Sequence, residues 1–258
     1  MNSENQIKES RHLLLDIGNT NLKWAWLRTA EMGDVTTACH KESDIAALAT
    51  EKWSNEDAPS QVYISCVAGQ AIEDKLADWC KQYWDLEPLF VKSVTQACGV
   101  INSYSEPERL GVDRWLSMIA LHVREPGPTC IVDCGTAVTI DAIGLEGKHL
   151  GGLILPGFSM MLQSLTENTS ITFENAVKSD GLLATDTETA VAAGGVLAVA
   201  ALVEQIQQEV AAEYGVTVDL VLTGGDAEIL RQAIRVPSRI ESDLVLHGLV
   251  AITNNEAD

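Results

Sequence analysis

Two stretches of the chain alternate hydrophobic and polar residues in the same way, and each predicts a pair of adjacent strands joined by a short turn. The first runs from Leu13 to Trp26 and the second from Ile131 to Asp141. Each begins with an apolar strand, continues with Asp-X-Gly and a nearby Thr, and ends in a second alternating strand. A hairpin repeated far apart in the sequence predicts two similar domains that face a shared cleft.

The rest of the pattern alternates between strand and helix, which is typical of a mixed α/β fold. Strands are predicted over residues 62–67, 89–91, 151–157 and 216–222. Helices are predicted over residues 44–53 (with Ser43 as N-cap), 72–83, 112–120, 158–165, 187–212 and 243–252. An extended surface loop is expected over residues 166–187, which are rich in Ser, Thr, Asn and Asp.

The loop from Arg124 to Pro128 is the best domain boundary in the sequence. We therefore expect an N-terminal domain over residues 1–125 and a C-terminal domain over residues 126–258. Residues 1–11 are polar and are expected to form a flexible leader, with no signal-peptide pattern.

Charge narrows the choice of partners. The chain has 258 residues and a formal net charge of -20, which argues against nucleic acid or an anionic membrane as partner. The most apolar run, residues 190–203, is too short to span a membrane. An anionic ligand would then be held by backbone amides, a metal ion and a few local cations.

The cysteines and histidines show no metal-binding spacing. Six cysteines form no C-x-x-C pair, and several lie in apolar patterns, which favours buried free thiols in a reducing cytoplasm. Five histidines are scattered along the chain. We therefore expect a cytoplasmic protein without a cysteine–histidine metal site.

The two turns are the best candidates for chemistry. Gly135 is expected to let the backbone turn without a Cβ in the way, and Thr136 adds a hydroxyl beside exposed amides. Together with Asp133, such a turn can hold a phosphate oxygen and a hydrated Mg²⁺. Two interpretations of Lys23 have equal weight: it contacts a phosphate group, or it is a solvated lysine on the return strand.

Asp113 and Arg114 lie in the first turn of a predicted helix. Taken alone, they favour a simple interpretation, in which Asp113 stabilises the helix dipole and Arg114 is a surface charge.

Four motifs in order resemble those of type III pantothenate kinases, members of the acetate and sugar kinase/Hsp70/actin superfamily. They are residues 16–23, 110–114, 133–141 and 151–157. The resemblance covers nearly the whole chain. It implies two ribonuclease-H-like domains around a central cleft, a homodimer, and ATP-dependent phosphorylation of pantothenate, the first step of coenzyme A biosynthesis.

The resemblance also implies roles for individual residues. ATP would be bound by Asp16, Ile17, Gly18, Asn19, Thr20, Asn21, Leu22, Lys23 and Thr136. Pantothenate would be bound by Tyr104, Gly111, Val112, Asp113, Arg114 and Thr187. Asp113 would accept the hydroxyl proton, and Arg114 would pair with the substrate carboxylate. Asp133 would hold a monovalent cation, K⁺ or ammonium, and Asp16 would contact the Mg²⁺ of ATP.

Two positions depart from the family pattern or fit it loosely. Asp186 stands where Asn often precedes the threonine, so Thr185 or Thr189 could replace Thr187 as the contact. Residues 223–225 resemble the superfamily's adenosine motif, where type III members hold the nucleotide loosely.

Four other classes of protein fit parts of the sequence. Aspartic proteases also duplicate an Asp-containing hairpin, but they need Thr or Ser directly after the Asp, where this chain has Ile17 and Cys134. Sugar kinases and exopolyphosphatase-type phosphatases share the paired phosphate turns, but are not expected to show the motif at residues 111–114. A nucleotide-binding regulatory protein is the non-enzymatic alternative, and the presence of every catalytic carboxylate disfavours it.

Overall fold

The computed structural model describes residues 10–41, 43–169 and 182–255. Of the expected leader, residues 1–9 lie outside the described residues. Of the expected surface loop, residues 170–181 also lie outside them. Of the remaining loop, residues 166–168 are helical. The chain forms two compact units, which we describe separately.

The first unit consists of Met1–Val94, Glu106–Ala120 and Val245–Asp258. Its strands are β1 (Arg11–Ile17), β2 (Asn21–Arg28), β3 (Glu31–Met32), β4 (Thr36–Cys39), β5 (Gln61–Cys66) and β6 (Leu89–Phe90). Its helices are α1 (Ile45–Trp53), α2 (Gln70–Trp84), the 3₁₀ helix η1 (Pro107–Arg109), most of α3 (Val112–Arg124) and nearly all of α7 (Leu244–Asn255).

The second unit consists of Thr95–Ser105 and Leu121–Leu244. Its strands are β7 (Gln96–Ala97), β8 (Val100–Ile101), β9 (Thr129–Cys134), β10 (Ala137–Ile143), β11 (His149–Pro156), β12 (Asp219–Thr223) and β13 (Arg239–Ile240). Its helices are the 3₁₀ helix η2 (Leu145–Gly147), α4 (Phe158–Asn168), α5 (Thr187–Tyr214) and α6 (Ala227–Ala233).

The two units do not correspond to a single division of the chain into two halves. Residues 95–105 pack with the second unit and residues 245–255 with the first. The division of the chain into domains over residues 1–125 and 126–258 stays a prediction.

The main sheets of the two units share one topology, which confirms the repeat seen in the sequence. The strand orders are β3-β2-β1-β5-β6, with β4 also paired to β2, and β11-β10-β9-β12-β13. In each sheet the first strand along the chain pairs antiparallel with the second and parallel with a strand that follows a helical crossover. Both sheets are therefore mixed, with a meander on one side and parallel strands on the other.

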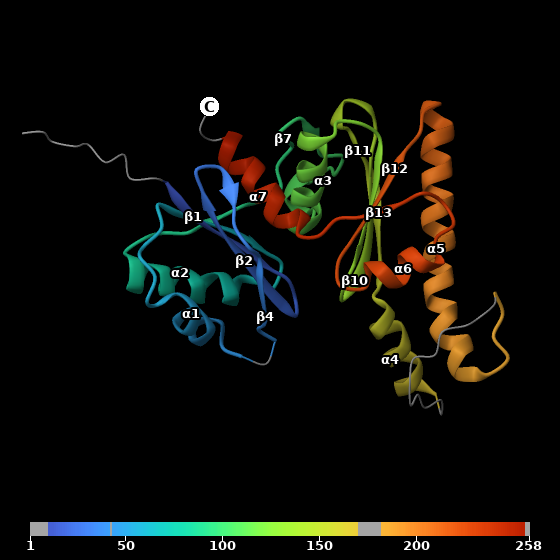
Figure 1. Cartoon of the computed structure of the whole chain (residues 1–258), viewed down its shortest axis with the longest axis horizontal. Coiled ribbons are helices and arrows are strands. Elements are labelled where there is room, and N and C mark those ends of the chain that lie inside the picture. The colour runs from blue at the N-terminus through green and yellow to red at the C-terminus, as the bar shows by residue number, and fades with distance from the viewer. Residues whose placement is uncertain (1–9, 42, 170–181, 256–258) are drawn as a thin grey trace, which may run out of the picture. The chain divides into compact units, whose positions relative to one another are not determined.

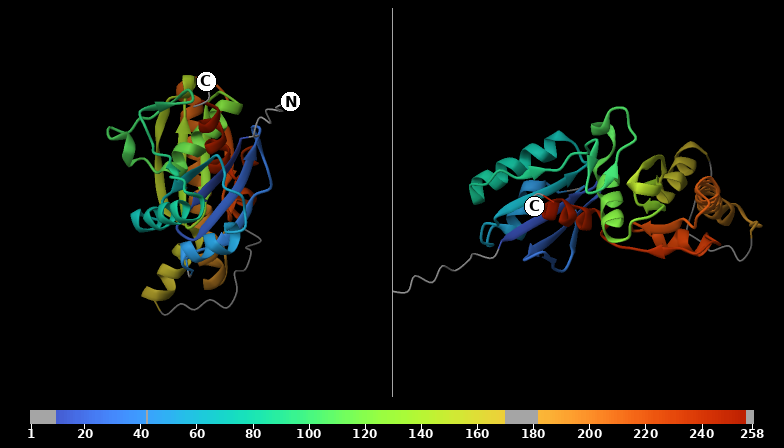
Figure 2. Two further views of the ribbon diagram at one scale, coloured as in Figure 1. Left: turned by 90° about the vertical axis from the view of Figure 1, so that its left-hand side faces the viewer. Right: turned by 90° about the horizontal axis from the view of Figure 1, so that it is seen from above.

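Helices cover both faces of the first sheet, α1 and α2 on one face and α3 and α7 on the other (Figure 1 and Figure 2). Leu13, Leu15 and Ile17 of β1 lie in a core with residues of α1 and α2. Leu14 lies in a second core with residues of α3 and α7. Because successive strand residues point to opposite faces, Asp16 points to the same face as Leu14, the one covered by α3 and α7.

The second sheet is covered on one face by α4, α5 and α6 (Figure 1). The even-numbered residues of β9, from Cys130 to Cys134, and those of β10, from Val138 to Ala142, lie in that core. The odd-numbered residues, among them Asp133 and Asp141, therefore point to the other face. Asp133 occupies the position in β9 that Asp16 occupies in β1, one residue before the strand ends.

Helix α5 matches the predicted helix over residues 187–212 to within two residues, and it extends well beyond the apolar run at residues 190–203. It has 28 residues and is long and apolar enough, by length and composition alone, to cross a membrane, so the expectation from residues 190–203 was wrong on length. The most apolar 18-residue window of this helix is 22% buried. Val199, Ala200 and Val203 pack into the core of the second unit, as core helices of soluble proteins also do. Gly215 ends the helix in the left-handed conformation, as expected from the sequence.

The N-cap of α1 differs from the predicted one by one residue. Asp44, not Ser43, is the N-cap, and its carboxylate accepts hydrogen bonds from the backbone N–H groups of Ala46 and Ala47 at 2.9 and 3.3 Å. Both residue types are good caps, so the sequence alone left the register undecided.

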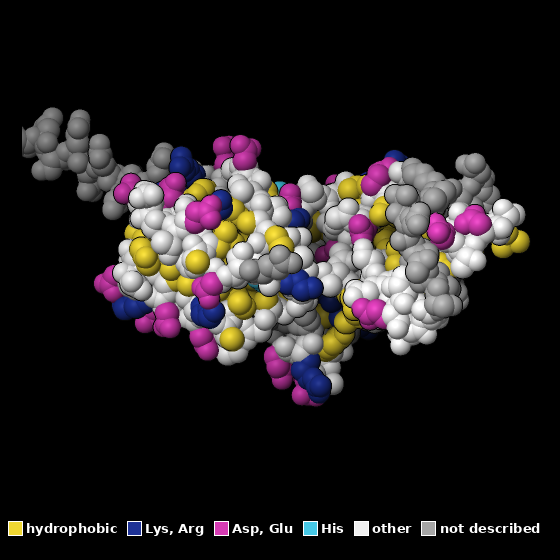
Figure 3. All heavy atoms as spheres, turned by 90° about the horizontal axis from the view of Figure 1, so that it is seen from below, with side chains coloured by type: hydrophobic (Ala, Val, Ile, Leu, Met, Phe, Trp, Pro, Cys, Tyr) yellow, Lys and Arg dark blue, Asp and Glu magenta, His cyan; other side chains and the backbone are white. Residues whose placement is uncertain are grey.

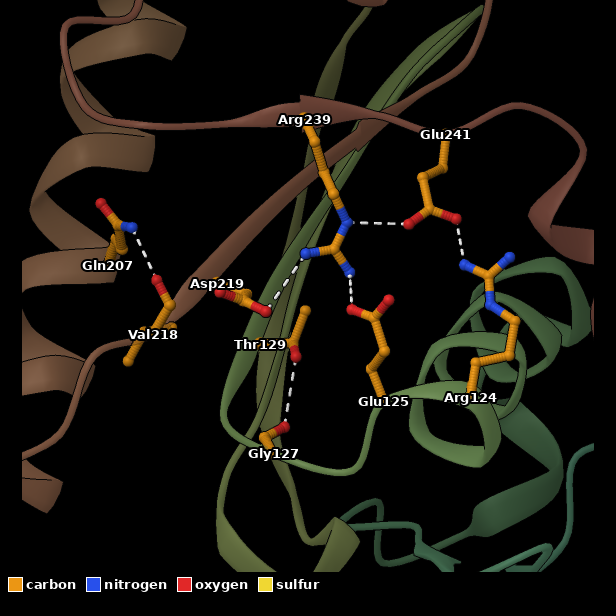
Figure 4. A network of polar contacts seen from close by, with 9 residues as sticks. All are labelled: Arg124, Glu125, Gly127, Thr129, Gln207, Val218, Asp219, Arg239 and Glu241. Atoms are coloured by element: carbon orange, nitrogen blue, oxygen red, sulfur yellow. Dashed lines mark hydrogen bonds and ion pairs between the residues drawn. The ribbon is translucent and has the colours of Figure 1, made fainter.

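Arg239 joins several carboxylates at one end of the second sheet (Figure 4). Its guanidinium donates to Glu241 at 2.8 Å, Glu125 at 2.6 Å and Asp219 at 3.1 Å. Glu241 also pairs with Arg124. Partial burial opposes ionisation of Glu241, but its bonds to Arg239 and Arg124 outweigh it and hold its pKa below the ordinary 4.5.

We expect Arg239→Gln to lower the free energy of unfolding by about 1 kcal/mol, because the pairs are largely exposed. The melting temperature should fall by roughly 2–4 °C. Since the pKa of Glu241 is lowered by folding, this stabilisation is present at neutral pH and is lost as the pH falls below about 4.5. Thermal unfolding of both proteins across this pH range checks the prediction. Arg231→Gln, which removes pairing with Glu228 alone, is the control. A gap between wild type and Arg239→Gln that stays constant down to pH 3 would contradict it.

Candidate functional site

The first turn places an acid and a lysine on one face of the first sheet. Asp16 and Lys23 are cross-strand partners in the register of β1 and β2, and both are half-buried. Their neighbours on this face, Leu14 and Ala25, pack in the core that includes α3. Lys23 is thus not a fully solvated strand lysine, and it lies beside the carboxylate expected to meet the metal of ATP.

His40, which the sequence analysis did not single out, holds this turn. Its Nε2 lies 2.7 Å from the carbonyl oxygen of Gly18, and its backbone N–H donates to the carbonyl oxygen of Thr20 at 3.0 Å. The side chain is only 6% exposed. Because C=O and N–H of one peptide group point in opposite directions, the N–H of Asn19 points away from His40. No local sequence signal marks His40, since it reaches the turn through the pairing of β2 with β4.

The start of α3 brings an acid and a buried cation to the same face of the first sheet. One carboxylate oxygen of Asp113 accepts the backbone N–H of Arg114 at 2.8 Å. A Cβ on Gly111 would lie only 2.6 Å from that oxygen, so glycine leaves room for the carboxylate. Arg114 is 6% exposed, which contradicts its interpretation as a surface charge. A buried guanidinium needs partners, and an anionic ligand group can be one.

In the second unit, oxygen-bearing side chains line up across three strands. Asp133 of β9 is in register with Thr139 of β10 on one side and with Thr223 of β12 on the other. All three point to the face opposite the helices, by the alternation of their strands. Carboxylate and hydroxyl oxygens are ligands suited to hard cations. Among the described residues, no group of three or more His, Cys, Asp and Glu forms a metal cluster.

The close packing around the second turn depends on Gly157 and Gly224, and not on Gly135 within the turn. A Cβ on Gly135 would meet no atom closer than 3.9 Å, so the steric reason given for this glycine was wrong. A Cβ on Gly157 would instead lie 2.2 Å from the carbonyl oxygen of Gly135 and 2.5 Å from that of Thr136. Gly224, at φ +90°, packs as closely against Asp133 and Cys134. The backbone at Gly157 and the backbone at Gly224 thus pack closely against the turn.

Cys134 stays a neutral thiol beside Asp133. Burial, together with the charges of Asp133 and Asp226, raises the pKa of Cys134 to about 12. None of the six cysteines is part of a disulfide. Three of them are buried, as expected, whereas Cys39 is exposed. A protonated thiol at this position leaves the carboxylate of Asp133 as the charged group at the end of β9.

The other predicted substrate contacts lie in the second unit. Tyr104 is half-buried and stacks on His149, with ring centroids 6.0 Å apart and planes at 16°. Thr187 is exposed at the first turn of α5, whereas Thr189 is 6% exposed. Asp186 is the N-cap of α5 and accepts the N–H of Thr189 at 2.8 Å, a role that Asn fills equally well. The exposed hydroxyls at 185 and 187 fit a ligand contact better than the buried one at 189, so exposure leaves Thr185 and Thr187 open.

Each unit therefore gathers its own part of the predicted site. The first brings the motifs at residues 16–23 and 111–114 to one face of its sheet. The second carries Asp133, Thr136, Tyr104 and Thr187.

Solved structures share this fold. A protein described as a Baf family transcriptional activator from Campylobacter jejuni aligns with a TM-score of 0.62 at 21% identity, covering 95% of this chain and 100% of that one. The (R)-2-hydroxyglutaryl-CoA dehydratase component A from Acidaminococcus fermentans aligns with a TM-score of 0.52 at 13% identity, covering 96% and 98%. With the repeated sheet and turn, the chain has the α/β fold of the actin, Hsp70 and sugar kinase superfamily.

Within this class, the chain belongs to the type III pantothenate kinase family, whose sequence model matches residues 12–209. The type III pantothenate kinase of Nitrosococcus oceani is 34% identical over 94% of this chain and 94% of its own. That of Paraburkholderia phytofirmans is 35% identical over 95% of this chain and 96% of its own. The sequence prediction of the family and of a kinase is confirmed.

Proposed function

We propose that this chain transfers the γ-phosphoryl group of ATP to the primary hydroxyl of pantothenate, the first step of coenzyme A biosynthesis. The observation that carries the proposal is the similarity to type III pantothenate kinases over almost the full length of both chains.

The proposed roles follow from the chemistry of the side chains. Asp113 accepts the proton of the pantothenate hydroxyl as this attacks the γ-phosphorus in line. Arg114 binds the substrate carboxylate through a charge-assisted hydrogen bond. The burial of Arg114 supports this role, since a desolvated cation binds an anion more strongly than an exposed one.

The turns bind the nucleotide in this proposal. Residues 16–23 contact the phosphates, with Asp16 near the Mg²⁺ and Lys23 near a phosphate oxygen, and Thr136 contacts ATP from the other turn. Tyr104, Gly111, Val112 and Thr187 complete the pantothenate site.

Asp133 holds the monovalent cation, K⁺ or ammonium. The register of Asp133 with Thr139 and Thr223 supports this assignment, because it provides only oxygen ligands. When bound, such a cation would supply positive charge that helps to stabilise the charge of the transferred phosphoryl group.

We also infer a homodimer in the cytoplasm that binds neither nucleic acid nor membrane. Helix α5 supports the dimer, because its residues 190–203 are apolar and most of them are not buried in the single chain. Leu153 and Ile154 on the edge strand β11 add exposed apolar surface, at 45% and 64% exposure. The absence of a disulfide among the six cysteines fits a reducing compartment. On the face shown in Figure 3, Lys and Arg side chains lie in separate small groups among acidic ones, which does not favour a polyanion as partner.

A coupled kinase assay with ATP, Mg²⁺ and pantothenate tests the function. We expect turnover with K⁺ or ammonium present, and at least about a tenfold loss when choline replaces K⁺ at equal ionic strength, because charge stabilisation in the transition state is removed. Glucose and polyphosphate, tested as alternative substrates, distinguish a pantothenate kinase from a sugar kinase and from a phosphatase. Binding of ATP without turnover of pantothenate in K⁺ would contradict the proposal and favour a regulatory nucleotide-binding protein.

A further inference from the structure

A short two-stranded tab lies along the start of β11. The tab comprises residues 95–104, including β7 and β8, and it meets the segment 147–149 at three successive points. A Cβ on Gly147 would lie 2.1 Å from the carbonyl oxygen of Gly99, and Ile101 forms a parallel bridge with Lys148. Ser103 and Tyr104 then both contact His149. The end of the tab that carries Tyr104 is thus fixed to one residue of β11.

His149 is itself held by a buried acid. Its Nε2 lies 2.9 Å from Oδ1 of Asp141, and the two residues are 0% and 3% exposed. Asp141 lies on β10, two residues beyond Thr139 and on the same face of the sheet. Burying a carboxylate costs folding free energy unless the carboxylate is paired. Packing alone therefore does not account for the presence of this buried His–Asp pair.

The pair sets the direction of the second ring nitrogen. Because the carboxylate of Asp141 accepts, Nε2 carries the proton in the neutral ring, and Nδ1 is left to accept the hydroxyl of Ser103 at 3.2 Å. The face of the same ring stacks on Tyr104. Asn102 is 7% exposed, and its side chain accepts the backbone N–H of Tyr104 at 3.0 Å. Tyr104 is therefore held both at its backbone and at its ring.

We propose that the buried His149–Asp141 pair positions Tyr104 for the pantothenate contact, with Ser103 as the link between the pair and the tab. His149 and Asp141 are positioning residues here, since they act through Tyr104. This inference rests on the proposed function, because it assigns Tyr104 to the pantothenate site. It makes the affinity for pantothenate, and not that for ATP, depend on the buried pair.

Steady-state kinetics on the full chain test this proposal. His149→Phe keeps an aromatic ring beneath Tyr104 and removes both hydrogen bonds of the imidazole. We expect the KM for pantothenate to rise on the order of ten- to a hundredfold, as for a misplaced contact, while the KM for ATP stays within about twofold. Ser103→Ala, at an exposed position, should fold normally and raise the KM for pantothenate about fivefold, the effect of one neutral hydrogen bond.

A double-mutant cycle separates positioning from general stabilisation. In a Tyr104→Ala background, adding His149→Phe should leave the KM for pantothenate unchanged, because the residue that it positions is gone. Arg239→Gln, in the same unit but away from the tab, is the matched control and should leave this KM unchanged. Equal effects on the KM values for ATP and pantothenate, or an undiminished effect of His149→Phe without Tyr104, would overturn the proposal.

Amide hydrogen exchange of residues 95–105 gives a readout that is independent of activity. Exchange should be faster in both His149→Phe and Ser103→Ala than in wild type. Wild-type protein that does not phosphorylate pantothenate would refute the proposed function. Unchanged exchange in His149→Phe would instead refute the role of the buried pair in ordering the tab.

Discussion

Asp113→Asn should lower kcat about 10²–10⁴-fold and change the KM for pantothenate by less than about threefold. Asparagine keeps the shape of the side chain, and its oxygen can still accept the backbone N–H of Arg114, which Asp113 accepts at 2.8 Å. It cannot take a proton from the substrate hydroxyl. The loss should therefore appear in the chemical step, and steady-state kinetics with saturating ATP and K⁺ measure it.

Asp74→Asn is a suitable control for this substitution. Asp74 is an exposed acid on α2 of the same unit, and it only accepts a hydrogen bond from Gln70. Its variant should match wild type in kcat, and both variants should unfold near the wild-type temperature. A kcat close to wild type in Asp113→Asn would remove the assignment of Asp113 as the base.

Gly157→Ala should destabilise the protein by about 3 kcal/mol or more, the upper range for overpacking. The new methyl group would lie 2.2 Å and 2.5 Å from the carbonyl oxygens of Gly135 and Thr136. Both are backbone atoms, so the turn itself must move. We expect the melting temperature to fall by roughly 6–12 °C. The KM for ATP should rise at least about tenfold, because Thr136 would no longer lie where we propose that it contacts the nucleotide.

Gly127→Ala is the matched control. Gly127 also lies in the second unit, and a Cβ there would meet no atom within 4 Å. Its variant should keep the wild-type melting temperature and KM for ATP. Equal melting temperatures for Gly157→Ala and Gly127→Ala would mean that the turn moves without cost, which would contradict the close packing around it.

The sequence by itself determined the repeated unit and the residues of the two turns. Alternation of apolar and polar residues is a local property, and so is the turn chemistry of Asp-X-Gly with a Thr one or two residues later. The hairpins at residues 13–26 and 131–141 were therefore predicted correctly. The family followed from the order of four motifs, and similarity over the whole chain confirms it.

Only the tertiary structure decided which residues surround the turns. His40 reaches Gly18 because β4 pairs with β2, and Thr223 reaches Asp133 because β12 pairs with β9. Likewise, Gly157 packs on a turn that precedes it by some twenty residues, and Arg114 is buried although charge indicated a surface position. These contacts depend on strand register and on the packing of α3, and no local pattern records either. Sequence therefore determined the chemistry of the turns, whereas their support came from segments that only the folded sheet brings together.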